Sequence, residues 1–159
     1  MHRTSINPKK GTRLTRQGRY SCPGQIYHVI ATTNDRKPRF IDVATGRCVV
    51  KTLIRMASED YATTLAYVVM PDHLHWLMQL RRSKSLSVCV GNVKSHSARM
   101  LNEMENRSGP VWTRGFFERA VRRDQDIVAA ARYIVANPLR AELVEHIGDY
   151  PLWDSIWMG

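Results

Sequence analysis

Residues 65–80 read LAYVVMPDHLHWLMQL and predict the centre of the fold. The first apolar run, Leu65–Met70, is too short for a helix and ends at Pro71 and Asp72, which favour a turn. A second strand-like run follows over His73–Leu80. Two such runs joined by a turn predict a β-hairpin through the middle of a sheet.

Further strands and helices are expected on both sides of this hairpin. Strands are indicated by β-rich or alternating runs, and helices by apolar residues at helical spacing. In chain order we predict a strand over Ile26–Ala31, a helix over Thr45–Asp60 capped by Asp42 or Thr45, a helix over Leu86–Glu105, a strand over Phe116–Arg123, a helix over Ile127–Ala136 closed by Pro138, and a short helix over Arg140–His146.

The resulting order, β-α-β-β-α-β-α, is typical of the split βαβ arrangement. We therefore predict an α+β fold of the ferredoxin-like or RRM-like type, with an antiparallel sheet of four to five strands and the helices packed on one face. Residues 1–22, rich in Lys, Arg, Gly, Thr and Ser, are expected to form a flexible basic arm. Residues 23–159 are expected to form the single domain.

The charge of the chain indicates an anionic partner. The sequence has 24 Lys and Arg residues against 14 Asp and Glu residues, a net charge of +10. Such an excess is typical of proteins that bind nucleic acids. An anionic membrane is the alternative partner, but it calls for a basic amphipathic helix or a polybasic run beside an apolar anchor. The basic residues here are scattered along the chain instead.

Cysteine usage and hydropathy predict a cytoplasmic, nucleoid-associated protein. Cys22, Cys48 and Cys89 lie far apart and form no CxxC pair, which argues against a disulfide framework or a zinc knuckle. No stretch approaches the length of apolar sequence that crosses a membrane.

Two pairs of residues could carry chemistry. His73 and His75 alternate along a predicted strand, so both imidazoles point to one face and could share a metal ion, or could simply be hydrogen-bonded on a half-buried strand. Tyr133 and Asn137 lie one helical turn apart, with their Cβ atoms about 5 to 6 Å from each other. Tyr133 offers a nucleophilic phenol and Asn137 a ligand oxygen, unless the ring packs on the core and Asn137 merely ends the helix before Pro138.

Three segments strongly resemble, in order, the single-tyrosine HUH transposases: Met70–His75, Trp112–Phe117 and Ala131–Pro138. Tyr27–Val29 and Gly148–Trp153 are similar to the REP-associated tyrosine transposase branch of that family. The resemblance spans the chain from Tyr27 onwards. It implies that the HUH histidines, on a central strand, are His73 and His75, that the nucleophile is Tyr133 and that the third metal ligand is Asn137. Asp72 stands where many relatives have Asn, and its carboxylate could orient a neighbouring histidine.

The resemblance also implies the reaction. A metal-dependent, sequence-specific single-stranded DNA endonuclease and strand transferase would form a 5′-phosphotyrosine, acting on repetitive extragenic palindromes or insertion-element ends. The expected cofactor is Mg²⁺ or Mn²⁺, although two imidazoles and an amide oxygen suit Mn²⁺ or Zn²⁺ better than Mg²⁺. The expected partner is single-stranded DNA with palindromic hairpins, and a monomer is favoured over a dimer as the form that binds it.

The basic residues that we nominate for DNA contact could each also be solvated surface charges. They are Arg36, Lys94, Arg99 and Arg114. Trp112 could stack on an unpaired base or belong to the core.

Two other functional classes remain as alternatives. A non-catalytic nucleic-acid-binding module fits the charge and the order of elements, but the aromatic signature of RNA-recognition sheets is not evident. A histidine-metal hydrolase of small molecules would leave the basic charge and Tyr133 unused.

Overall fold

The computed structural model describes residues 21–81 and 84–158. The predicted hairpin is present, since Met70 pairs with His73 and the turn consists of Pro71 and Asp72. The predicted basic arm lies outside the described residues except for Ser21 and Cys22. The elements are β1 (Ile26–Thr32), the 3-10 turn η1 (Asn34–Arg36), α2 (Val43–Ser58), β2 (Ala62–Met70), β3 (His73–Leu80), α3 (Leu86–Glu105), β4 (Phe117–Val121), α4 (Asp124–Val135), α5 (Asn137–Arg140), the 3-10 turn η2 (Ile147–Asp149) and β5 (Trp153–Ser155).

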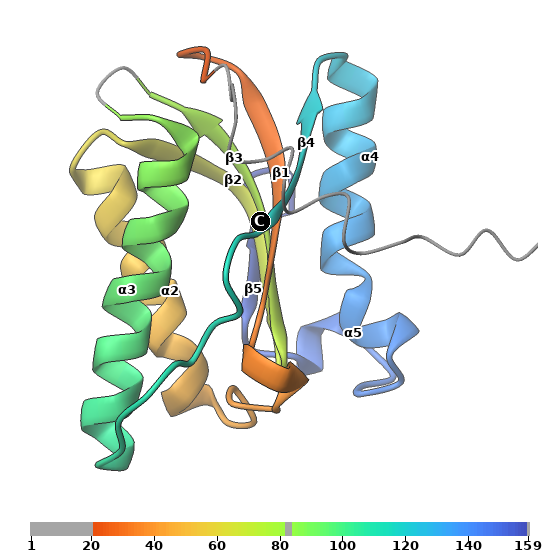
Figure 1. Ribbon diagram of the computed structural model, residues 1–159. Coiled ribbons are helices and arrows are strands. Elements are labelled where there is room, and N and C mark those ends of the chain that lie inside the picture. Colours follow the sequence, from red (N-terminus) through yellow and green to blue (C-terminus); the bar gives the residue numbers. More distant parts are fainter. Residues whose placement is uncertain (1–20, 82–83, 159) are drawn as a thin grey trace, which may run out of the picture.

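The strands form one sheet in the order β4-β1-β3-β2-β5, and every neighbouring pair is antiparallel. β3, which carries His73 and His75, is the central strand (Figure 1). The predicted α+β fold with an antiparallel sheet of four to five strands is therefore confirmed.

The prediction that the helices share one face of the sheet is wrong. α2 and α3 cover one face, whereas α4 lies against the other (Figure 1). On the first face, the helices enclose a core that includes Val69, Leu74 and Trp76. On the second, Ile127 and Ile134 of α4 pack in a cluster with strand residues such as Leu65, Val68 and Leu77. Because β2 and β3 are apolar on both sides, each face of their hairpin needs a cover.

Two details at the C-terminal end differ from the predicted elements. The helix predicted over Arg140–His146 is absent, because α5 ends at Arg140 and Glu142 adopts a left-handed backbone conformation (φ 56°) that an α-helix does not tolerate. Pro138 lies within the first turn of α5, where its missing N–H costs nothing. β5, which the element order had not included, pairs with β2.

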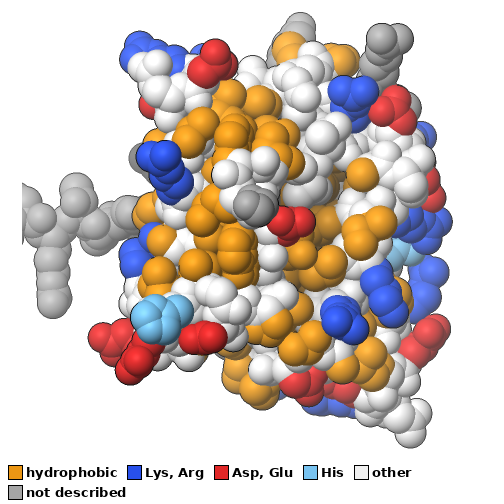
Figure 2. Space-filling view, turned by 180° about the vertical axis from the view of Figure 1, so that it is seen from behind, with side chains coloured by type: hydrophobic (Ala, Val, Ile, Leu, Met, Phe, Trp, Pro, Cys, Tyr) orange, Lys and Arg blue, Asp and Glu red, His pale blue; other side chains and the backbone are white. Residues whose placement is uncertain are grey.

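The β5 side of the molecule, seen from behind in Figure 2, carries a band of hydrophobic side chains with most Lys and Arg residues at its margins. Ile54 and Ile156 are exposed there and line an apolar pocket of about 300 Å³ between α2, β2 and β5. Within the described residues, no helix is both long and apolar enough to cross a membrane.

Candidate active site

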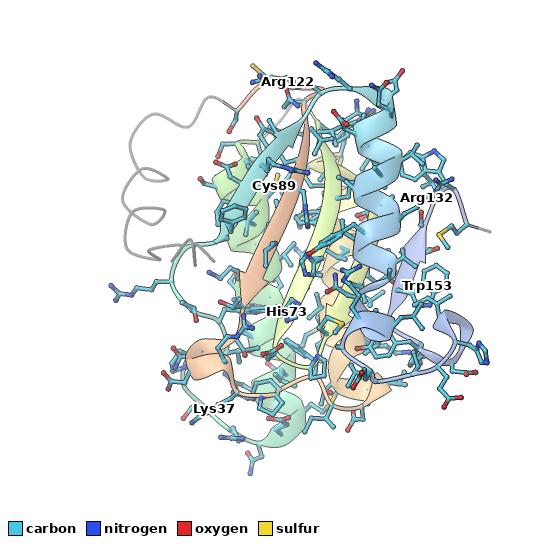
Figure 3. All side chains as sticks on the ribbon, turned by 90° about the vertical axis from the view of Figure 1, so that its right-hand side faces the viewer. Lys37, His73, Cys89, Arg122, Arg132 and Trp153 are labelled. Carbon is cyan, nitrogen blue, oxygen red and sulfur yellow. The ribbon has the colours of Figure 1, made fainter. Side chains whose placement is uncertain are left out.

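The alternation of side chains along the central strands brings three histidines to the α4 face of the sheet. On β3, Leu74 and Trp76 point into the core under α2 and α3, so His73 and His75 point the other way. Their ring centroids are 4.9 Å apart. His28 of β1 joins them, with its ring centroid 5.1 Å from that of His75. Figure 3 labels His73 near the end of the sheet. The predicted placement of His73 and His75 on one face is what the structure has.

His28 and His75 form a buried hydrogen bond between Nε2 of His28 and Nδ1 of His75, 2.9 Å apart. Burial lowers the pKa of His75 to about 3, and the charges of His73, His28 and Arg140 add to this effect. Burial likewise lowers the pKa of His28 to about 4, with a further contribution from Arg119. Both rings are therefore neutral at neutral pH, so one donates its proton to the other.

Asp72, in the hairpin turn, binds the side chain of His73. Its Oδ1 lies 2.6 Å from Nδ1 of His73, and its Oδ2 lies 3.3 Å from Nε of Arg36. A carboxylate on Nδ1 keeps the proton there and leaves Nε2 with its lone pair free. Nδ1 of His73 is therefore bound by Asp72, and Nδ1 of His75 is bound by His28. Nε2 of His73 and Nε2 of His75 have no hydrogen-bond partner among the described residues.

Tyr133 lies on α4 with 56% of its surface exposed. The guanidinium of Arg140, from α5, lies over its ring at 3.9 Å from the centroid. Nη2 of Arg140 also donates to the Tyr133 carbonyl at 2.7 Å. The ring is therefore held from the α5 side and is more than half exposed, so the alternative of a ring packed on the core does not hold.

Asn137 begins α5, one turn after Tyr133 as the spacing predicts. Its Nδ2 donates to the Ile134 carbonyl at 3.2 Å, which fixes the amide and leaves Oδ1 without a partner among the described residues. Within the same residues, no group of three or more His, Cys, Asp and Glu side chains could hold a metal ion. The donors that remain for a metal here are the free Nε2 atoms of His73 and His75 and an amide oxygen, a set that by ligand type suits Mn²⁺ or Zn²⁺.

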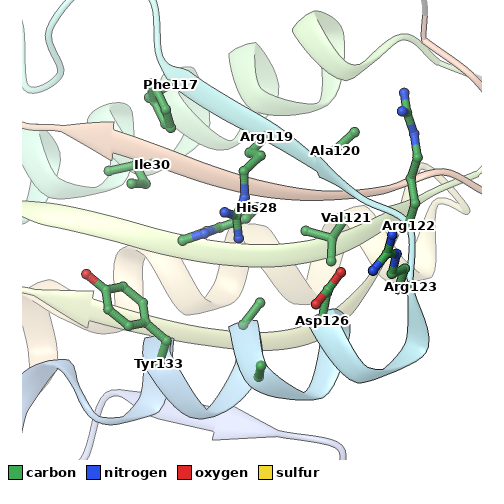
Figure 4. Close-up of a pocket in the computed structure, with 12 residues that line it drawn as sticks. His28, Ile30, Phe117, Arg119, Ala120, Val121, Arg122, Arg123, Asp126 and Tyr133 are labelled. Carbon is green, nitrogen blue, oxygen red and sulfur yellow. The ribbon is translucent and has the colours of Figure 1, made fainter. Parts of the chain in front are cut away.

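A groove adjoins Tyr133 between α4 and the β1-β4 edge of the sheet, with a volume of about 730 Å³ (Figure 4). Its lining includes His28, Phe117, Arg119 and Tyr133. His28 and Arg119 are partners in the β1-β4 register. The groove thus connects the histidine site with the exposed edge strand.

The four basic residues predicted to contact DNA do not gather at one place. Arg36 lies beside the site through its ion pair with Asp72. Arg114 is exposed in the segment before β4. Lys94 and Arg99 lie on α3, on the other side of the sheet from Tyr133 (Figure 1). Their contact with DNA stays a prediction.

Lys94 and Trp112 both have structural partners. Lys94 donates through Nζ to the carbonyls of Thr113 and Gly115, at 2.6 and 2.7 Å, and so ties α3 to the segment before β4. Trp112 is buried, donates to Ser97 Oγ at 3.0 Å and packs against Phe40. Trp112 therefore belongs to the core, as one of its two predicted alternatives had it.

His28 and Arg140 belong to the site although the sequence motifs do not include them as site residues. His28 alternates with the core residues Tyr27 and Val29, which places it on the opposite face, but its contact with His75 depends on the strand register. Arg140 follows Tyr133 by seven residues, a spacing of two helical turns. This spacing indicates that Arg140 could lie near Tyr133.

The chain is similar to known transposases in sequence and in fold. The sequence profile of the family described as "Transposase IS200 like" matches residues 21–137. A Haemophilus influenzae protein assigned as a REP-associated tyrosine transposase is 31% identical over 139 residues, covering 80% of this chain and 78% of that protein.

Two solved structures share the fold. A REP-associated tyrosine transposase bound to a REP hairpin superimposes with a TM-score of 0.70 at 20% identity, over 86% of this chain and 79% of that one. A Deinococcus radiodurans protein assigned as a transposase gives a TM-score of 0.51 at 22% identity, over 86% of this chain and 96% of that one.

Proposed function

The chain belongs to the IS200-like transposase family, on the branch of the REP-associated tyrosine transposases, and from this premise we propose that it cuts and rejoins single strands of DNA with Tyr133 as the nucleophile. The observation that carries the proposal is the pair of free Nε2 atoms on His73 and His75, on the face that α4 covers with the exposed Tyr133. A binding module would have no use for such an arrangement.

We propose that His73, His75 and Asn137 hold a divalent metal ion, Mg²⁺ or Mn²⁺. Bound there, the ion would act as a Lewis acid on a non-bridging oxygen of the scissile phosphate. His28 and Asp72 orient the two imidazoles, each through Nδ1. Asn137 is oriented by its own bond to the Ile134 carbonyl.

The chemical step belongs to Tyr133. Its Oη forms a bond to phosphorus while the bond from phosphorus to the 3′ oxygen breaks. The phenol gives up its proton, and the leaving oxygen becomes a 3′-hydroxyl. Because one phosphodiester replaces another, a later 3′-hydroxyl can attack the 5′-phosphotyrosine and rejoin strands without ATP. Arg140, beside the tyrosine ring, adds positive charge next to the reacting phosphate.

The substrate that we propose is DNA that folds into palindromic hairpins, in repetitive extragenic elements or at the ends of insertion elements. The net charge of +10 supports a DNA substrate, and the REP hairpin bound by the structural relative supports a hairpin. We propose a monomer as the acting species.

The test is to incubate the protein with Mn²⁺ and palindromic single-stranded DNA labelled at either end, and to separate the products on a denaturing gel. We expect a 3′-labelled strand to migrate with the protein and a 5′-labelled strand to be released as a free fragment. EDTA and Tyr133→Phe should each abolish the adduct. Tyr61→Phe, a tyrosine packed against the core under α2 and α3, is the matched control and should retain it.

Two results would overturn the proposal. An adduct that persists in Tyr133→Phe would show a different nucleophile. Tight binding that EDTA does not change, with no adduct on any palindrome, would favour the non-catalytic nucleic-acid-binding module.

A further inference from the structure

The groove beside Tyr133 combines an exposed aromatic ring with a cluster of arginines. Phe117, on the edge strand β4, is 60% exposed although it is a large hydrophobic residue. Arg119, Arg122 and Arg123 line the same groove (Figure 4). Because Phe117 is exposed in the same groove as these arginines, its ring is available to a ligand that the arginines also contact.

The floor and wall of the groove place these groups in one row. Phe117 pairs with Ile30, and Arg119 pairs with His28, so both side chains stand on the α4 side of the sheet. The wall is α4, which contributes the small Ala129 and, at one end, Tyr133. The volume of about 730 Å³ lies within the range that ligand sites in proteins usually have.

The charge of the groove is suited to an anion. Its three arginines form no ion pair within residues 21–81 and 84–158, and Asp126 is its one acidic lining residue. Arginine is well suited to phosphate because its guanidinium presents several donors in one plane. An aromatic platform beside such cations is the combination that binds single-stranded nucleic acid.

We propose that this groove, which we call the β4 groove, binds unpaired nucleotides next to the phosphodiester that Tyr133 attacks. Phe117 stacks on a base, and Arg119, Arg122 and Arg123 contact phosphates. The proposal rests on the proposed function, because Tyr133 defines which phosphate is cut. From Asp126 to Tyr133, α4 rises roughly 10 Å. At roughly 3.4 Å per stacked nucleotide, this is the length of about three nucleotides.

Two other occupants fit the groove less well. A second copy of the chain pairing along the β4 edge would bring these arginines against their own counterparts, and like charges repel. A DNA duplex keeps its bases stacked on each other and so has no free base face for Phe117.

The arginines are tested by the salt dependence of binding. The full-length Tyr133→Phe protein, with EDTA present, binds a short fluorescent single-stranded oligonucleotide without cutting it, and fluorescence anisotropy gives its affinity. For single strands, each phosphate contact contributes about −0.7 to the slope of log K against log salt. The triple variant Arg119→Ala, Arg122→Ala, Arg123→Ala should therefore reduce the slope by about 2. Arg47 is an exposed arginine of α2 on the other face of the sheet. Arg47→Ala should change the salt slope by less than the contribution of one phosphate contact, about 0.7.

The aromatic platform is tested with a matched pair of ligands. Phe117→Ser should weaken binding of the oligonucleotide by roughly 5-fold to 150-fold with no change in salt slope. It should have no effect on an abasic oligonucleotide of equal length, which keeps the phosphates and lacks the bases. Phe117→Tyr keeps the ring and should restore the affinity.

The outcomes separate the groove from the chemistry. A slope that is unchanged in the triple variant, or an equal effect of Phe117→Ser on both ligands, would overturn the β4 groove even if Tyr133 forms its adduct. Both predicted effects without any adduct would leave the groove standing and overturn the proposed function. Self-association that the Phe117→Ser variant abolishes, with unchanged DNA affinity, would assign this edge to a second copy of the chain.

Discussion

The two faces of the sheet differ in how completely they are covered. On one face, α2 and α3 enclose a core in which Trp76, Leu74 and Met78 of β3 are almost entirely inaccessible to solvent. On the other face, α4 packs mainly on β2 and β3, and part of the β1-β4 half of the sheet is left open as the β4 groove. Every charged or reactive group of the proposed site lies on this partly covered face or at its end.

Because side chains alternate along β3, successive residues of this strand contribute in turn to the core and to the proposed site. Side chains that point towards α2 and α3 contribute apolar burial, which is the main favourable term in folding. Those that point towards α4 include the two histidines, which gain no comparable burial energy and are held by His28 and Asp72. Substitutions on the closed face should change the free energy of unfolding, and substitutions on the open face should change metal and DNA binding.

The largest expected effect is that of Trp76→Ala on the closed face. Trp76 is 0% exposed, and removing its side chain should lower the free energy of unfolding by about 3 to 5 kcal/mol. Urea denaturation followed by circular dichroism measures this loss. Trp76→Phe gives up the hydrogen bond to Thr64 Oγ1 but keeps a ring, so it should lose less. A loss below about 1 kcal/mol for Trp76→Ala would show that the closed face does not dominate stability.

Ser97→Ala should have the next largest effect, also on the closed face. Ser97 Oγ accepts from Trp112 Nε1 at 3.0 Å and donates to the Val93 carbonyl at 2.6 Å. Its removal leaves a buried indole N–H without a partner, which should cost about 1 to 3 kcal/mol of unfolding free energy. Ser95→Ala, at an exposed position of the same helix, is the control. Equal stabilities of the two variants would contradict the assigned role of this hydrogen bond.

On the open face, His28→Phe should weaken Mn²⁺ binding while leaving the fold intact. If Nε2 of His75 is the ligand atom, Nδ1 of His75 must donate to His28, and losing that acceptor should reduce metal affinity by about 10-fold to 100-fold. Isothermal titration with Mn²⁺ measures the affinity. His28→Gln offers an acceptor again and should recover part of it.

The tautomer of His75 provides a second test of this orientation, and the measurement needs no metal. In the metal-free protein, ¹⁵N NMR should show the proton of His75 on Nδ1, and His28→Phe should remove this preference. A proton found on Nε2 of His75 in the unaltered protein would contradict the orientation that we assign.

The difference between the faces also explains what the sequence could predict. The hairpin over residues 65–80 was clear because a turn separates two runs of strand length, and alternation then placed His73 and His75 together. The apolar stripe of α4 predicts a helix but not which face of the sheet it covers. The unbroken apolar run from Leu65 to Met70 was the available sign that both faces are buried. β5 has three residues, too few for a recognisable alternation.

How far the site could be predicted depends on whether its residues are close in sequence or are brought together by the pairing of strands. Tyr133 and Asn137 are related by one helical turn, which the sequence displays. The contact between His28 and His75 joins residues 47 positions apart and needs the antiparallel register of β1 on β3. Glu142 ends the C-terminal helix by a backbone conformation that its residue type does not announce. Contacts that depend on strand register, such as that between His28 and His75, therefore cannot be predicted from local sequence spacing.

The smallest expected effect is that of Arg140→Lys, which keeps the charge and removes the planar group that lies over Tyr133. A cation-π contact at an exposed site contributes about 0.5 to 1 kcal/mol, and the lysine ammonium keeps part of it, so the rate of adduct formation should fall by at most about 5-fold. The single-turnover rate with labelled single-stranded DNA measures this. Arg132→Lys, an exposed arginine on α4, is the matched control and should keep the full rate. If both variants react equally fast, charge alone is what Arg140 contributes, and the clamp on the tyrosine ring has no part in positioning the nucleophile.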